Sequence, residues 1–92
     1  MSALRVVVAL ESSGPGGAEN MVLELARELR RTGDEAVIAT LRPGWMTERA
    51  ASAGIPVWVA PQRPGLDPLW VPRFAARLRR ERIDVLHSHE FA

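Results

Sequence analysis

The chain has 92 residues, a net charge of +1 and no cysteine. This length suffices for one domain with a modest core, and the nearly balanced charge gives no argument for nucleic-acid binding. The lack of cysteine excludes a disulfide framework, a zinc–thiolate site and a cysteine nucleophile. The early apolar run Val6–Leu10 is too short for a signal peptide or a membrane-spanning helix, so we expect a cytoplasmic protein.

The first part of the chain predicts a strand followed by a helix. Residues Leu4–Leu10 are apolar and rich in valine without alternation, as in a parallel strand that is buried on both faces. A helix is expected from about Ala18 to Arg31, with Glu19 in its first turn and Gly33 just beyond its end. Its apolar stripe has helical spacing and consists of Ala18, Met21, Val22, Leu25, Ala26 and Leu29.

The middle of the chain repeats this alternation. Residues Glu35–Leu41 predict a second strand, and Met46–Ala53 predict a short helix that ends at Gly54. Residues Ile55–Ala60 predict a third strand. Pro56 within it favours an edge position, because proline cannot donate to a neighbouring strand.

The last part predicts a loop, a helix and a fourth strand. Pro61–Pro68 is a loop, and a helix that began at its end would place Pro72 where a backbone N–H is needed. We therefore expect one loose turn and then a helix over Pro72–Arg82, followed by a strand over Ile83–His89. The predicted buried stripe of this helix is Phe74, Ala75 and Leu78.

This order of elements predicts a Rossmann-like α/β fold. Strands that alternate with helices form a parallel sheet with right-handed crossovers, here in the strand order 3-2-1-4 with helices on both faces. Ligands of such sheets bind at the carboxyl ends of the strands, where the strand order reverses. That point lies between the first and fourth strands, so the glycine turn 14–19 should meet the polar segment 87–90.

The glycine turn is a candidate phosphate site. Gly16 and Gly17 would let backbone N–H groups approach an oxyanion at a helix N-terminus, although a tight structural turn explains the same glycines equally well. Ser13 follows the first strand and is a candidate for the same cleft, with ordinary loop polarity as the alternative. A nicotinamide fingerprint fails because Glu19 stands at its third glycine position, and a Walker loop fails because no lysine follows.

The candidate catalytic group is one of two histidines. His87 and His89 lie on the same side of a strand, but a metal site would need further ligands, and Glu90 points to the other face. We expect no metal ion and no cofactor. His89, predicted just past the strand end, is the candidate that faces the cleft, whereas His87 is expected to pack inside the protein. Glu90 is included among the candidate substrate-binding residues.

The predicted last helix is strongly basic. Arg73, Arg77 and Arg80 are candidates for peripheral contact with an anionic membrane surface on the inner face of the membrane. A solvated arginine-rich face is the more common meaning of such a run.

Taken together, these residues resemble the N-terminal domain of GT-B-fold glycosyltransferases of family 4, the glycogen-synthase-like group. The resemblance rests on Gly16–Glu19 with the helix 21–26, on Ala53–Val57, and on Ile83–Glu90, in the order and spacing of that family. It covers essentially the whole chain.

The resemblance implies transfer of a sugar from a nucleotide-sugar donor to a sugar or lipid acceptor, with retention of configuration. It places the acceptor on this domain, Gly16 and Gly17 near the donor phosphates, and His89 near the transferred sugar. Asn20 stands where the family often has Arg or Lys, and the donor domain of the family is absent from residues 1–92. We therefore expect an incomplete domain that is inactive alone. A non-catalytic phosphate-binding or interaction module, and a sugar-nucleotide epimerase, are the alternatives.

Overall fold

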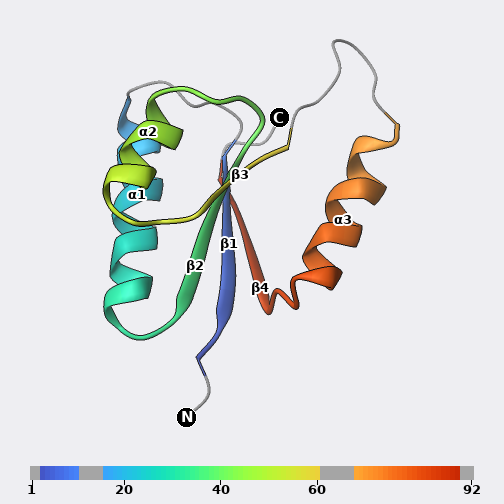
Figure 1. Cartoon of the computed structure of the whole chain (residues 1–92), viewed down its shortest axis with the longest axis horizontal. Helices are drawn as coiled ribbons and strands as arrows, with labels where there is room; N and C mark the ends of the chain where they lie inside the picture. Colours follow the sequence, from blue (N-terminus) through green and yellow to red (C-terminus); the bar gives the residue numbers. More distant parts are fainter. Residues whose placement is uncertain (1–2, 11–15, 61–67, 90–92) are drawn as a thin grey trace.

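The protein is described here from a computed structural model, which covers residues 3–10, 16–60 and 68–89. Strands and helices alternate along the chain (Figure 1). The elements are β1 (Arg5–Leu10), α1 (Gly17–Arg31), β2 (Glu35–Thr40), α2 (Trp45–Ser52), β3 (Val57–Val59), α3 (Trp70–Arg80) and β4 (Val85–His89).

The four strands form one parallel sheet in the order β3-β2-β1-β4. The predicted Rossmann-like α/β architecture and strand order are therefore confirmed. β3 lies at one edge, as Pro56 predicts, although it is shorter than expected. The carbonyl of Pro56 accepts a hydrogen bond from the N–H of Ile38 at 3.0 Å, which shows how the strand pairs without a donor at this position.

The sheet separates two cores, because side chains alternate along β1. Val6, Val8 and Leu10 pack on one face against α1 and α2, whereas Val7 and Ala9 pack on the other face near α3. Figure 1 shows this arrangement, with α1 and α2 on one side of the sheet and α3 on the other. The continuous apolar run of β1 is thus explained by burial on both faces.

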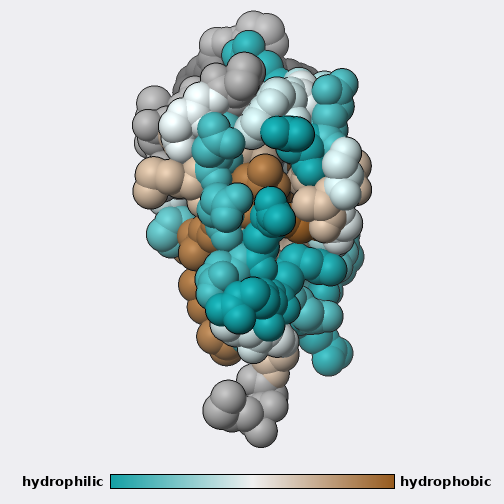
Figure 2. All heavy atoms as spheres, turned by 90° about the vertical axis from the view of Figure 1, so that its left-hand side faces the viewer, coloured by the Kyte–Doolittle hydropathy of each residue, from teal (hydrophilic) through white to brown (hydrophobic). Residues whose placement is uncertain are grey.

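The buried face of α1 differs in part from the predicted stripe. Met21 is 63% exposed, whereas Leu23 is buried. Leu23 lines a groove together with Arg49, Ser52 and Ala53 at the end of α2, so a second helix covers this flank of α1. The outer surface of this side is mostly hydrophilic (Figure 2).

The last helix begins two residues earlier than predicted. With Leu69 as its N-cap, Pro72 is the third helical residue, where no intrahelical N–H donor is required. The first helical bond comes from the N–H of Arg73 to the carbonyl of Leu69 at 3.1 Å. Phe74 and Leu78 of the predicted stripe are half-buried and pack against the core on this face.

Candidate functional site

The site is built where α1 begins, at the carboxyl edge of the sheet. Gly16 is the N-cap, with extended backbone (φ 176°, ψ −180°), and Gly17 is the first helical residue. The first helical hydrogen bond runs from the N–H of Asn20 to the carbonyl of Gly16 at 3.0 Å. The backbone N–H groups that precede Asn20 in the first turn therefore have no intrahelical acceptor, and they carry the partial positive charge of the helix N-terminus.

The two glycines have different surroundings. A Cβ at Gly16 would lie 2.8 Å from Oε1 of Glu19, whereas a Cβ at Gly17 would meet no atom of the described residues within 4 Å. Gly17 also lacks a positive φ, so its backbone conformation does not require glycine. Gly16 thus leaves room for a neighbouring carboxylate, and the open side of the turn, where a ligand can approach the backbone, is at Gly17.

Two side chains at this turn were not predicted to shape it. Glu19 is buried, with 8% exposure, and its carboxylate occupies the Gly16 side of the turn. Asn20 donates from Nδ2 to the carbonyl of Gly16 at 2.8 Å, which fixes the N-cap residue. Glu19 is the third helical residue, and an acidic side chain at this position can reach back over the helix N-terminus. The spacing between Gly16 and Glu19 is therefore a signal in the sequence that predicts this contact.

The end of β4 lies at the same edge of the sheet as the start of α1 (Figure 1). His89 is the last residue of β4 and is paired in register with Leu10, the last residue of β1. His89 thus ends the strand, as the predicted bounds Ile83–His89 have it, and does not lie just past the strand end. Its backbone nevertheless stands at the predicted switch point, together with the strand that leads to the glycine turn. Ser13 and Glu90 lie outside the described residues.

His87 differs from its prediction. It pairs in register with Val8, but it is exposed and not packed inside. The physical reason is the position of β4, which is an edge strand in the described part of the chain. The same exposure extends to Val85 and Leu86, which are 42% and 44% exposed.

The three candidate membrane arginines do not share one environment. Arg80 and Arg73 are exposed, whereas Arg77 is half-buried, with its guanidinium 4.2 Å from the centroid of the Trp58 ring. None of the described helices combines the length and the apolar composition that crossing a membrane would require. Within residues 3–10, 16–60 and 68–89, no three His, Asp or Glu side chains gather as a metal site would require.

The chain is thus a parallel α/β domain whose strand order reverses between β1 and β4, which is where ligands of such sheets generally bind. Residues 15–92 match the model of the family described as Glycosyltransferase Family 4, so the chain belongs to this family. The resemblance deduced from the glycine turn, the Ala53–Val57 segment and the histidine segment is thereby confirmed.

Two solved structures share this fold. A glycosyltransferase from Rickettsia africae is 16% identical, with a TM-score of 0.83, over 100% of this chain and 25% of its own length. HepE from Anabaena, solved in complex with UDP and glucose, is 22% identical, with a TM-score of 0.69, over 92% of this chain and 23% of its own. The chain thus spans about a quarter of either structure. No curated protein sequence matches the chain.

Proposed function

We propose that residues 1–92 form the acceptor-side, N-terminal part of a longer glycosyltransferase. This enzyme transfers a sugar from a nucleotide-sugar donor to a sugar or lipid acceptor with retention of configuration. The observation that carries the proposal is the family match over residues 15–92, joined to a helix N-terminus and a histidine-bearing strand end at one edge of the sheet. HepE, which shares the fold, was solved with UDP and glucose, and this favours a nucleotide-sugar donor.

In this proposal the glycine turn acts on the leaving phosphate. Negative charge develops on that phosphate as the glycosidic bond to the nucleotide breaks, and preorganised N–H donors stabilise it without reorganisation. The open side at Gly17 gives the phosphate access to these donors, because no atom of residues 3–10, 16–60 or 68–89 lies where its side chain would be. The carboxylate of Glu19 on the Gly16 side disfavours approach of an anion from that direction.

His89 is proposed to lie near the transferred sugar and to stabilise the transition state. In the longer enzyme, we expect His89→Ala to lower kcat by about a hundredfold or more, the usual loss for one preorganised group at a developing charge. His87→Ala is the matched control, because His87 lies one strand period earlier and is exposed. It should change kcat by less than about threefold, since a side chain one strand period away from the proposed reacting atoms contributes little to stabilising them. Both variants need circular dichroism spectra like that of the parent. Intact turnover in His89→Ala with lost turnover in His87→Ala would reassign the histidine.

A peripheral membrane contact through α3 belongs to the same proposal, for an enzyme that works at the cytoplasmic surface. Leu69 and Val71, at the start of α3, are 58% and 65% exposed beside the exposed Arg73. Apolar and cationic side chains together are what binds a helix to an anionic lipid surface. Leu69→Ser with Val71→Ser should therefore reduce co-sedimentation with phosphatidylglycerol vesicles. Unchanged sedimentation of this double variant would remove the membrane contact from the proposal.

The family match favours the transferase over the two alternatives, the non-catalytic module and the epimerase.

A further inference from the structure

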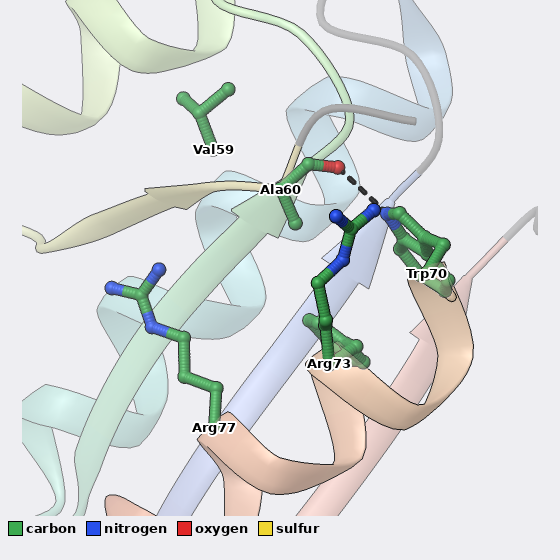
Figure 3. Close-up of a pocket in the computed structure, with 6 residues that line it drawn as sticks. Val59, Ala60, Trp70, Arg73 and Arg77 are labelled. Atoms are coloured by element: carbon green, nitrogen blue, oxygen red, sulfur yellow. Dashed lines mark hydrogen bonds between the residues drawn. The ribbon is translucent and has the colours of Figure 1, made fainter. Parts of the chain in front are cut away.

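A second concave surface lies on the α3 side of the sheet, beside the end of β3 (Figure 3). Its volume is about 290 Å³, at the small end of the range for ligand pockets. It is on the opposite face of the sheet from α1 and the glycine turn. The residues that line it are Val59, Ala60, Trp70, Arg73, Phe74 and Arg77.

One wall of this pocket is aromatic and fixed in place. The rings of Trp70 and Phe74 are stacked, with centroids 5.0 Å apart and an interplanar angle of 11°. The indole Nε1 of Trp70 donates a hydrogen bond to the carbonyl of Ala60 at 2.9 Å, which ties the start of α3 to the end of β3. The ring pair therefore offers a flat apolar surface at little cost in side-chain entropy.

The other wall is cationic. Figure 3 shows Arg73 and Arg77, one helical turn apart on α3, both reaching toward the strand that carries Val59 and Ala60. The guanidinium of Arg77 stacks over Trp58, which holds it in a fixed orientation. Its Nε is buried and has no hydrogen-bond acceptor among the described residues. None of the six lining residues is acidic.

An N–H that is unsatisfied by the described residues, in a rigid cationic wall, indicates an acceptor from a bound ligand, because burying such a group without a partner is unfavourable. Guanidinium groups match the oxygens of phosphate and carboxylate. Two of them one turn apart favour phosphate, which carries more charge and more oxygens than a carboxylate and can therefore contact both. We propose that this pocket binds an organic phosphate, with its phosphoryl group on Arg77 and Arg73 and its apolar part against Trp70 and Phe74. This inference does not depend on sugar transfer.

The test titrates the 92-residue chain with phenyl phosphate, with isothermal calorimetry and tryptophan fluorescence as readouts. Inorganic phosphate and phenol are the matched half-ligands. We expect saturable binding of phenyl phosphate with one site per chain, tighter than binding of either half-ligand. Absence of saturable binding, or equal affinity for phenyl phosphate and inorganic phosphate, would overturn the assignment of a joint phosphoryl and aromatic site.

Three arginine-to-glutamine variants distinguish binding in the pocket from general electrostatic attraction between a basic helix and an anionic ligand. Arg73→Gln and Arg77→Gln should each weaken phenyl phosphate binding by about tenfold, as expected for loss of a charge-assisted hydrogen bond. Arg80→Gln removes the same charge from an exposed position outside the lining and should weaken binding by less than about twofold. Because Arg77 also packs on Trp58, circular dichroism checks its fold, and the exposed Arg73 carries the test if Arg77→Gln is unstable. Equal losses in all three variants would refute the pocket.

The phosphoryl group could come from a soluble ester or from a lipid headgroup, and a competition experiment distinguishes them. The chain is bound to phosphatidylglycerol vesicles and then exposed to saturating phenyl phosphate. If phenyl phosphate releases the parent chain from the vesicles but does not release Arg73→Gln, the result supports the pocket with a lipid headgroup as its ligand. Retention on the vesicles, with phenyl phosphate still bound, supports the pocket with a soluble phosphate ester as its ligand.

Discussion

Substitution of Gly17 should change activity and stability in opposite directions. An added Cβ at this position meets no atom within 4 Å in the part of the chain that the structure describes, and the residue has no positive φ. Replacing glycine by alanine in a helix reduces the entropy of the unfolded chain, so Gly17→Ala should raise the free energy of unfolding by about 0.5–1 kcal/mol. Gly17→Val keeps the fold as well, but its branched side chain occupies the open side of the turn.

The same open side is where the proposed donor phosphate approaches. Loss of a hydrogen bond to a charged group costs about 1.5–3 kcal/mol, which corresponds to roughly ten- to a hundredfold in kcat/KM. Gly17→Val should therefore lower kcat/KM for the nucleotide sugar by that factor in the longer enzyme. Gly17→Ala should have a smaller effect, because a single methyl group excludes less space.

The assay pairs steady-state kinetics with urea unfolding on the same preparations. Met21→Val is the control, because it places a valine at an exposed position of the same helix away from the turn. It should leave kcat/KM unchanged. If Gly17→Val retained kcat/KM within about threefold while folding normally, the backbone of this turn would not contact the donor. If Gly17→Val unfolded the protein, the inference that its surroundings are open would be wrong.

Three further predictions follow from the fold. The 92-residue chain alone should transfer no sugar, because both substrates must be held together for the reaction; turnover above a His89→Ala control, measured with common nucleotide sugars, would contradict this. It should also self-associate through the exposed edge of β4, which light scattering can measure, and Leu86→Lys should reduce the association; a monomeric parent chain would disprove this role of the edge. Arg82, with φ 55°, lies two residues beyond the end of α3 in a conformation that favours glycine, so Arg82→Gly should stabilise the chain by about 0.5–1 kcal/mol in thermal or urea unfolding. In the matched experiment, Gly54→Ala should destabilise the chain, because Gly54 has φ 73°. Destabilisation by Arg82→Gly together with stabilisation by Gly54→Ala would refute this backbone argument.

Sequence patterns determined the elements and their order because the relevant signals are local. The apolar run of β1 specifies burial on both faces, and Pro56 marks an edge strand through its missing donor. Gly33 and Gly54 both have a positive φ and follow the ends of α1 and α2, as glycines that stop helices do. Alternation of strands and helices then leaves few topologies, and the observed order is the common one.

The environment of individual side chains was decided only by tertiary packing. Periodicity places Met21 on the apolar stripe, but the burial of Leu23 in its place depends on α2 lying along one flank of α1. His87 looks like a core residue in a parallel strand, yet it is exposed because β4 lies at the edge of the described sheet.

The two candidate sites show the same division. The glycine turn and the histidine segment were found from sequence, because the switch point follows from topology and the residues at it are recognisable. The carboxylate of Glu19 over Gly16, and the guanidinium of Arg77 over Trp58, join residues through side-chain rotamers and element contacts that no local pattern encodes. Composition showed that α3 is basic, but only the packing of α3 beside β3 turned one of its arginines inward and left a pocket next to it.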